Sequence, residues 1–528
     1  MSSAASDPCS KTVILSGADT AGCKQTQSRW ILAATILASS MAFIDGTVVN
    51  VALPFLQREL NATSIGVQWV VESYSLFLAA LLLVGGSLGD RYGRRRIFLI
   101  GISIFAIASA SCGLSLNIGQ LIAARAVQGI GGALLVPGSL AIISASFSKE
   151  QRGKAIGTWS GFSAITTAIG PVLGGWLVEH FSWRAVFFLN LPLAVAVFVI
   201  SLWRVPESRE QSQSGPLDFV GAILATLGLG GIVYGLIESS RVGFSNPVVI
   251  VSLVTGVLLL CAFIYNESRV KNPMVPLKLF QSRDFSGANL LTLFLYAALG
   301  GMLFFFTLNL IQVQHYSATA AGSALLPFVV IMFSLSRWSG GLVDRFGPRP
   351  PLVVGPIITA IGFALLALPS PASHYWTGYF PAVMVLGLGM AITVAPLTTT
   401  VMGAVVSEQA GVASGINNAV SRAAGLIAIA VFGVVMLFSF SHSLPARLSQ
   451  IQLDASVRNS LVAQSMRLGG IEVPGDLNPT VRKEVDDAIA SSLVHGFRLL
   501  MFISMGLALA SGVSAWILIK GKEGAKAE

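Results

Sequence analysis

The chain is dominated by long apolar runs, each close to the roughly 20 residues that an α-helix needs to cross the hydrocarbon core of a bilayer. Of its 528 residues, 54% are hydrophobic and 11% are charged. A water-soluble chain carries roughly 25% charged residues. The composition therefore excludes a soluble globular protein and predicts an all-α integral membrane protein that crosses the bilayer many times.

The apolar runs fall into three groups separated by polar segments. The first group predicts six helices, at 30–52, 67–88, 97–116, 118–143, 155–178 and 185–203. The second predicts two helices, at 219–237 and 248–265. The third predicts six more, at 285–310, 321–342, 352–368, 379–397, 411–438 and 497–519. The sequence thus predicts 14 transmembrane helices.

Lys and Arg gather in alternate loops, which is typical of the cytoplasmic side of a membrane protein. The basic loops lie at 91–96, 149–154, 204–209, 269–283 and 345–349, and Lys520 follows the last run. The pattern predicts a multi-pass protein of the cell (inner) membrane with both termini in the cytoplasm. Because the excess of Lys and Arg lies in these loops, the net charge of +9 reflects the orientation of the protein in the membrane, and no nucleic-acid partner is expected.

These boundaries divide the chain into five regions. Residues 1–29 are polar, without the short apolar stretch and cleavage site of a secretory signal, and are expected to be a disordered cytoplasmic leader. A six-helix half at 30–203, two inserted helices with linkers at 204–283, and a second six-helix half at 284–519 follow. Residues 520–528 form a cytoplasmic tail. Within the second half, the extracytoplasmic segment 439–494 fits a small amphipathic cap or an irregular loop, and the sequence leaves both open.

The first and last groups of helices resemble each other. Gly86, Asp90, Arg91, Gly93 and Arg95 recur 254 residues later as Gly340, Asp344, Arg345, Gly347 and Arg349. A second set of matches, starting from Gly129 and Gly131, recurs 258 residues later at Gly387 and Gly389. Parallel repeats around a central binding site are a common way to build a secondary transporter.

Four short motifs carry a family resemblance. The segment 86–96, GSLGDRYGRRR, resembles the loop signature between helices two and three of the major facilitator superfamily. FIDGTVVNVALP at 43–54 is similar to the first-helix signature of its fourteen-span drug:proton antiporter family, and LIAARAVQGIG at 121–131 to the fourth-helix motif. A fifth-helix pattern associated with antiporters is matched by Gly157, Gly170, Pro171, Gly174 and Gly175. The resemblance implies a major-facilitator fold whose two extra helices lie between the halves.

Three charged residues are expected deep within the helices. Asp45 lies about 15 residues, or about 22 Å, from the cytoplasmic start of its helix. Glu72 and Arg125 enter from the opposite side, roughly five and seven residues into their helices, so all three lie at comparable depth. Because a carboxylate in the hydrocarbon is costly, it marks an ion path by default. We expect Asp45 to carry the proton, Glu72 to be a second carrier or a partner for cationic substrates, and Arg125 to drive proton release. The alternative is that Glu72 only extends toward the membrane surface and that Asp45 only pairs structurally with Arg125.

Two further sets of residues are candidates for conformational change. The resemblance favours a cytoplasmic latch at the repeated loop, formed by Gly86, Asp90, Arg91, Gly93 and Arg94 with Asp344 and Arg345 as its weaker twin. The alternative is that its arginines only fix topology. The five fifth-helix residues named above suit a hinge, although a small-residue packing face would require the same residues.

Polar and aromatic residues within the spans are candidates for the substrate pocket. Arg422 lies about 11 residues into its helix. We expect it to anchor a helix end; a substrate contact is the alternative. The other pocket candidates are Asn50, Trp69, Tyr74, Asn289, Asn417 and Asn418.

The resemblance implies a proton-coupled antiporter that exports hydrophobic or amphipathic, including cationic, drugs by alternating access. The alternatives are a dedicated exporter of one metabolite or lipid and a non-transporting sensor. An enzyme is not expected, since the chain has no GxxxxGK[ST] phosphate loop and no HExxH motif. Its four cysteines have no metal-ligand spacing, so neither a metal nor a cofactor is expected. The expected partners are the bilayer, protons and a small hydrophobic substrate; the protein is expected to be a monomer unless an accessory protein binds it.

Overall fold

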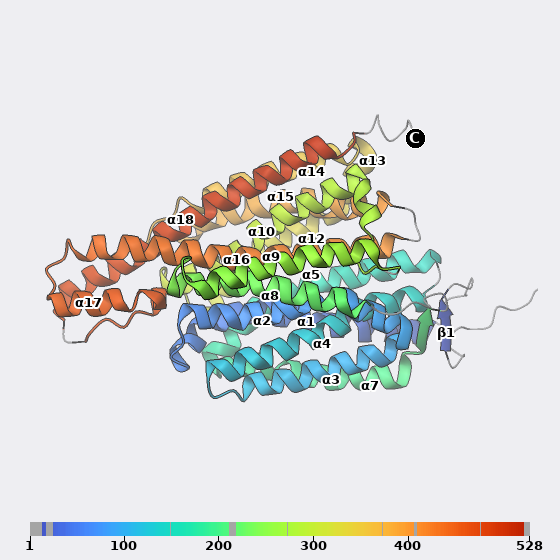
Figure 1. Cartoon of the computed structure of the whole chain (residues 1–528), viewed down its shortest axis with the longest axis horizontal. Helices are drawn as coiled ribbons and strands as arrows, with labels where there is room; N and C mark the ends of the chain where they lie inside the picture. Colours follow the sequence, from blue (N-terminus) through green and yellow to red (C-terminus); the bar gives the residue numbers. More distant parts are fainter. Residues whose placement is uncertain are drawn as a thin grey trace, which may run out of the picture.

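A computed structural model of the chain describes residues 13–16, 25–147, 149–210, 218–271, 273–371, 373–405, 409–475 and 477–521. Most of its helices run along one long axis (Figure 1). The first helices are α1 (Gln25–Glu59), α2 (Ser64–Tyr92), α3 (Arg94–Gly113), α4 (Ile118–Ser146), α5 (Lys149–His180), α6 (Trp183–Phe188), α7 (Asn190–Arg204), α8 (Phe219–Val242) and α9 (Pro247–Arg269). The others are η2 (Leu277–Gln281), α10 (Arg283–Gln312), α11 (Ala318–Ser323), α12 (Leu326–Gly340), α13 (Leu342–Phe346), α14 (Arg349–Leu366), η3 (Tyr375–Tyr379), α15 (Phe380–Gly403), α16 (Ala410–Leu448), α17 (Ala455–Ala463), η5 (Ser465–Gly470) and α18 (Pro479–Leu518).

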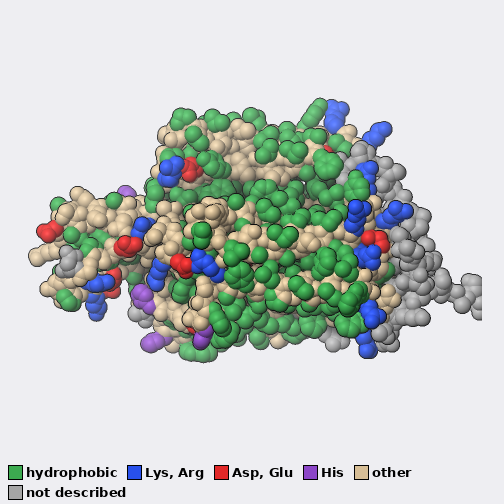
Figure 2. All heavy atoms as spheres, turned by 90° about the horizontal axis from the view of Figure 1, so that it is seen from below, with side chains coloured by type: hydrophobic (Ala, Val, Ile, Leu, Met, Phe, Trp, Pro, Cys, Tyr) green, Lys and Arg blue, Asp and Glu red, His purple; other side chains and the backbone are tan. Residues whose placement is uncertain are grey.

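The number of membrane-spanning helices agrees with the sequence prediction. Within the described residues, 13 helical stretches are long and apolar enough to cross a membrane, with α6 joined to α7, α11 to α12 and η3 to α15. The 32-residue α5 is the fourteenth helix of spanning length. Figure 2 shows the apolar side chains in a broad band across one face, with most Lys and Arg near its two ends. This is the surface that a bilayer requires.

The two inserted helices form a hairpin against both halves. Helices α1–α7 make the first half and α10–α18 the second, and α8 packs against α2 of the first and α16 of the second (Figure 1). Glycines allow α8 and α9 to approach closely. A Cβ on Gly256 would lie 2.7 Å from the backbone nitrogen of Ile232 and 2.9 Å from the carbonyl of Gly228. The predicted fold, two six-helix halves with an inserted pair, is confirmed.

The internal repeat extends to the backbone. Gly93 has φ 110° and its counterpart Gly347 has φ 79°, so both copies of the loop signature turn through a conformation that favours glycine. A Cβ on Gly131 of α4 would lie 2.6 Å from the backbone nitrogen of Phe105 on α3. One on Gly389 of α15 would lie 2.5 Å from the backbone nitrogen of Thr359 on α14. Thr359 follows Phe105 by the same 254 residues, so the halves repeat the same helix contacts.

The two ends of the bundle differ, and we name them for use below. At the end here called the cap end, α16 and α18 extend beyond the apolar band and are joined through α17 and η5 (Figure 1). Their apolar residues form a small core that includes Phe440, Leu444, Leu448, Leu461 and Val485. Of the two possibilities for segment 439–494, the structure therefore has the helical cap. The opposite end, which carries β1 and the end of α18, is here called the tail end.

At the tail end, part of the leader is ordered by pairing. Strand β1 (Val13–Ser16) pairs in parallel with β2 (Glu207–Glu210), with Val13 opposite Glu207. Its sequence, VILS, favours an extended strand because two of its residues are β-branched. Helix α1 also begins at Gln25, earlier than the predicted residue 30. The leader is therefore not wholly disordered, because residues 13–16 form a strand and residues 25–29 are helical. The described residues do not include 1–12, 17–24 or the tail from 522.

The halves contact each other closely near the cap end. A Cβ on Gly322 of α11 would lie 2.1 Å from the carbonyl oxygen of Pro171 on α5. Beside it, Glu179 accepts hydrogen bonds from the backbone nitrogen and hydroxyl of Thr319, at 2.8 and 2.6 Å. Gln68 of α2 donates to the carbonyl of Ile429 on α16 at 2.9 Å. These contacts join the two halves along the cap-side part of their interface.

Candidate functional site

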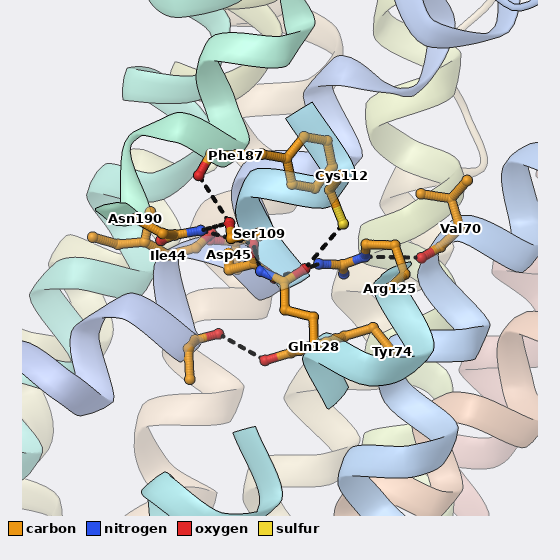
Figure 3. A network of polar contacts seen from close by, with 12 residues as sticks. Ile44, Asp45, Val70, Tyr74, Ser109, Cys112, Arg125, Gln128, Phe187 and Asn190 are labelled. Carbon is orange, nitrogen blue, oxygen red and sulfur yellow. Dashed lines mark hydrogen bonds and ion pairs between the residues drawn. The ribbon is translucent and has the colours of Figure 1, made fainter. Parts of the chain in front are cut away.

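Asp45 lies on α1 inside the first half, with no exposed surface. Its Oδ2 accepts a hydrogen bond from Arg125 Nη1 of α4 at 2.5 Å, which makes a buried ion pair (Figure 3). Arg125 is 1% exposed. The structure therefore brings together the two residues to which the sequence analysis assigned the proton and the fixed charge. Such a pair is stable in an apolar interior only if further hydrogen bonds satisfy the remaining atoms.

Two amides and a hydroxyl supply those bonds around Asp45 (Figure 3). Its Oδ1 accepts from Gln128 Nε2 at 2.8 Å and from Asn190 Nδ2 at 3.1 Å. Asn190 also donates to Ser109 Oγ at 3.0 Å, and Ser109 donates to the carbonyl of Phe187 at 2.8 Å. Asp45 is thus bonded directly to α4 and α7, and through Asn190 and Ser109 it is connected to α3 and α6.

Sequence reasoning missed Asn190 and Ser109 as members of this site. Asn190 interrupts the apolar stretch FFLNLPL, and it begins α7 directly after the break at Leu189. A lone polar residue within an apolar run is the signal that could have identified it, because such a residue needs a partner in the membrane. The side chain is fully buried, and its Oδ1 has no hydrogen-bond partner in the described part of the chain.

Arg125 is held on its other side by α2. Its Nε donates to the carbonyl of Val70 at 3.1 Å, and its guanidinium carbon lies 4.2 Å from the centre of the Tyr74 ring. Tyr74 in turn donates from its hydroxyl to the carbonyl of Ala42 on α1, at 3.3 Å. The Tyr74 ring therefore covers the ion pair, and only 3% of this residue is exposed. Sequence analysis placed Tyr74 in the substrate pocket; here it lies between helices α1, α2 and α4.

Glu72 does not join this network within the described residues. It is fully buried, and neither of its carboxyl oxygens has a hydrogen-bond partner. Its neighbours along α2 show where it points. Gln68 donates a hydrogen bond to α16, and the Trp69 ring lies 6.2 Å from that of Tyr234 on α8. A Cβ on Gly230 of α8 would lie 3.4 Å from Leu76. Glu72 therefore lies on the α2 face directed at α8 and α16, away from Val70 and Tyr74.

The candidate latch lies at the tail end between α2 and α3. Asp90 Oδ1 accepts a hydrogen bond from Arg94 Nε at 2.7 Å. The guanidinium carbon of Arg91 lies 5.5 Å from the centre of the Tyr92 ring. Glu207 of β2 also belongs to this loop, although no sequence pattern pointed to it. Its carboxylate accepts from the backbone nitrogens of Arg95 and Arg96, at 3.0 and 3.2 Å, and so caps the N-terminus of α3. A Cβ on Gly86 would lie 3.6 Å from Pro137 of α4. The twin residues Asp344 and Arg345 lie on α13.

The candidate hinge glycines of α5 lie at helix contacts. Cβ atoms on Gly170 and Gly174 would lie 2.2 Å from Thr47 and 2.3 Å from Val48, both on α1. Gly175, by contrast, faces the second half and would meet the backbone of Ala318 at 2.5 Å. Gly157 has open space around it. Helix α5 therefore packs closely against both halves through its cap-side glycines.

The remaining pocket candidates separate into buried and accessible residues. Asn417 of α16 donates to Asn289 at 3.2 Å and to Thr292 at 2.7 Å, which ties α16 to α10. Asn418, the next residue, is exposed. On α1, Asn50 is partly buried, and Gly46 is exposed with nothing within 4 Å of its Cβ position. Open space therefore adjoins the middle of α1, one residue from Asp45.

Arg422 does not anchor a helix end as the sequence analysis expected. It makes no hydrogen bond or ion pair with the described residues, and it is partly exposed. Ile429, seven residues later, accepts a hydrogen bond from Gln68 of α2, and a Cβ on Gly415, seven residues earlier, would lie 3.3 Å from Leu83 of α2. Because residues seven apart share a face of a helix, Arg422 lies on the face of α16 that is directed at the first half.

Known proteins resemble this chain over most of its length. The family model described as Major Facilitator Superfamily matches residues 35–429. Multidrug resistance protein Stp of Mycobacterium tuberculosis (strain CDC 1551 / Oshkosh) is 36% identical over 81% of this chain and 80% of its own length. The tetracenomycin C resistance and export protein of Streptomyces glaucescens is 32% identical over 92% and 90%.

The fold is also found among solved structures. A bacterial homologue of the human lysosomal transporter Spinster, in an inward-facing and unoccupied conformation, aligns with a TM-score of 0.63 at 16% identity, over 93% of this chain and 98% of its own. The expected resemblance is thereby confirmed by sequence, by helix count and by fold. This chain belongs to the major facilitator superfamily of membrane transporters.

Proposed function

We propose that the protein is a proton-coupled antiporter that exports hydrophobic or amphipathic compounds by alternating access, with Asp45 as the proton-binding residue. The observation that carries the proposal is the fully buried Asp45–Arg125 pair with its amide partners. An ionisable residue at such depth is expensive, which favours a role in an ion path. Relatives named for drug resistance and export support the direction of transport.

Protonation of Asp45 would break this ion pair, because the neutral acid no longer attracts the guanidinium of Arg125. Arg125 stays charged, since a guanidinium is not deprotonated in proteins. The new O–H needs an acceptor, and Asn190 can provide one. If its amide turns over, the unpartnered Oδ1 takes the position from which Nδ2 now donates, 3.1 Å from Asp45. The same side chain would then serve both protonation states.

Release of the proton would follow when the helices bring Arg125 back onto Asp45. The ring of Tyr74 on α2 lies against the Arg125 guanidinium and its hydroxyl bonds α1, so a shift of α2 relative to α1 and α4 would open or close access to the ion pair. Substrate binding on the far side of Tyr74 would favour one of these arrangements. The proposal thus assigns Tyr74 to the barrier between the proton site and the substrate path.

Glu72 remains a candidate second carrier. A buried carboxylate without a partner costs far more free energy than its protonated form, so Glu72 would hold a proton in this conformation. Its place beside α8 and α16 would couple that proton to movements of the second half and the inserted hairpin.

The conformational cycle itself would use the tail-end loop and α5. In this proposal Asp90, Arg91 and Arg94, with Asp344 and Arg345 as twin, form the latch, and the glycines around Pro171 form the hinge. The charge pattern of the loops supports a cytoplasmic location for the tail end and for both termini. The protein would act in the cell membrane as a monomer, unless an accessory protein binds it.

The direct test is substrate-induced proton release from proteoliposomes loaded at acid pH, with ethidium as the first probe. The native protein is expected to release protons when ethidium is added, whereas Asp45→Asn binds ethidium without releasing them. Glu238→Gln is a matched control, because this acid on α8 pairs with Arg241 away from the site. Native-like proton release by Asp45→Asn would exclude Asp45 as the carrier, and Glu72→Gln would then be tested in the same assay.

A further inference from the structure

Arg422 occupies an unusual place for an arginine in a membrane helix. It follows the start of α16 by 12 residues, or about 18 Å along the helix. Other deep or interfacial arginines have partners: Arg125 pairs with Asp45, and Arg498 donates to the carbonyls of Leu368 and Pro369. Arg422 makes no such bond with the described residues and is partly exposed.

The side chain faces the inside of the transporter. Arg422 shares a face of α16 with Ile429, seven residues later, whose carbonyl accepts a hydrogen bond from Gln68 of α2 in the first half. Asn418 precedes Arg422 by four residues and therefore lies on the same face of α16. It is exposed, and its amide nitrogen donates to its own helix at Ser414. Arg422 and Asn418 thus present polar groups toward α2 of the first half.

The charges in this region do not cancel. Asp45 and Arg125 neutralise each other. Neither carboxyl oxygen of Glu72 has a hydrogen-bond partner in the described part of the chain, and Glu72 is protonated in the function proposed above, so it does not balance Arg422. Arg422 therefore adds one permanent positive charge to this region. Water can solvate this guanidinium while the region is accessible, but closure around a substrate removes water, and an unpaired buried charge is strongly unfavourable. A partner with negative charge must then be supplied.

We propose that Arg422, assisted by Asn418, binds an anionic oxygen of the exported compound: a carboxylate, sulfonate or phenolate on an apolar body. The guanidinium offers several donors in one plane, which suits two-point contact with such a group. A cation gains nothing from Arg422 and would bind through apolar contacts away from it, so a cation such as ethidium is expected to be a weaker substrate. This inference rests on the proposed export function and narrows its preferred substrate class from amphipathic compounds in general to those with an anionic head.

The test uses two probes that share an aromatic scaffold and differ in charge. 1-Anilinonaphthalene-8-sulfonate is anionic, and N-phenyl-1-naphthylamine is its neutral analogue. Binding of each to the full chain in nanodiscs is measured by fluorescence, with the signal of empty nanodiscs subtracted. Arg422→Gln is expected to weaken binding of the sulfonate about tenfold, as for loss of a charged hydrogen bond, and to leave the neutral probe within about twofold. Arg422→Lys is expected to retain part of the preference.

Several controls make the result decisive. Arg241→Gln removes an arginine at the exposed end of α8 and should change neither probe. Undiminished binding of the neutral probe to Arg422→Gln shows that this variant is folded. Equal effects on both probes, no effect on either, or tighter binding of ethidium than of the sulfonate to native protein would overturn the inference.

The inference and the proposed function fail in different ways. Binding in nanodiscs requires no proton gradient. If the sulfonate preference depends on Arg422 but neither ethidium nor the sulfonate induces proton release in proteoliposomes, the antiport proposal is wrong and the anion site stands. If proton release occurs and Arg422→Gln does not distinguish the probes, antiport stands and the anion site is wrong.

Discussion

Arg125 Nη1 lies 2.5 Å from Asp45 Oδ2, and this contact joins α4 to α1 within the first half. Both side chains are almost completely buried, so the two charges depend on each other and on the amides around them. Removing one partner from such a pair leaves an uncompensated charge, whereas replacing both can be nearly neutral. The relationship can therefore be tested through stability as well as through transport.

Arg125→Gln is expected to destabilise the protein by about 3–5 kcal/mol, because Asp45 loses its counter-charge. Asp45→Asn should destabilise it as well, and the double variant Asp45→Asn/Arg125→Gln should lose less stability than the two single losses together. Thermal unfolding in detergent checks this as a double-mutant cycle. The pair Arg241–Glu238, whose arginine is exposed, is the control cycle, with an expected coupling of about 0–1 kcal/mol. Additive losses at the buried pair would show that the two residues do not interact.

Ser109→Ala is expected to lower substrate-induced proton release, because Asn190 loses the hydroxyl that orients its amide toward Asp45. Asn190→Leu should lower release further, by about tenfold, since the aspartate then loses a donor outright. Proteoliposome proton release measures both. Ser103→Ala is the matched control on α3, because the Ser103 hydroxyl bonds only the carbonyl of Leu99 in its own helix. Equal behaviour of the two serine variants would argue against a role for Asn190.

The depth of charged residues could be predicted from the sequence, but their direction could not. Counting residues from helix ends placed Asp45, Glu72 and Arg125 at similar depth, and two of them do meet. Glu72 lies two residues from both Val70 and Tyr74, which contact Arg125. Two residues correspond to about 200° around a helix, so Glu72 points to nearly the opposite side. The face of α2 that meets α4 is decided by packing, which residue counts do not contain.

The repeat predicted local backbone geometry better than it predicted partners. Gly93 and Gly347 were matched from sequence alone, and both adopt positive φ. Glu207, by contrast, lies more than 100 residues from the loop that it caps. Contacts across such a separation depend on the arrangement of α3, α7 and β2 in three dimensions.

Gly93→Ala is expected to destabilise the protein by about 1–3 kcal/mol, because alanine is strained at φ 110° and its Cβ would lie 2.8 Å from the Glu207 carboxylate. Gly347→Ala tests the same kind of strain in the twin loop, at φ 79°. Thermal unfolding in detergent compares both with Gly506→Ala, a glycine of α18 with open space around its Cβ position. A loss for Gly506→Ala as large as that for Gly93→Ala would contradict the strain argument.

The contact between Gly322 and Pro171 predicts how the halves can be separated at the cap end. A Cβ at residue 322 would lie 2.1 Å from the carbonyl oxygen of Pro171, closer than any real contact, so α11 and α5 would have to move apart. Gly322→Ala is therefore expected to shift the protein away from the conformation described here. Glu179→Gln should act in the same direction but more weakly, because Thr319 loses a charged acceptor.

Electron–electron distance measurements between spin labels test this shift. Phe181 at the end of α5 and Trp376 in η3 are highly exposed cap-end positions in opposite halves, and cysteines introduced there, with the native cysteines replaced, provide the labels. Gly322→Ala should move the distance distribution to longer values, whereas Gly506→Ala should leave it unchanged. An unchanged distribution in Gly322→Ala would mean that α11 adapts locally, and that this close approach does not hold the two halves together.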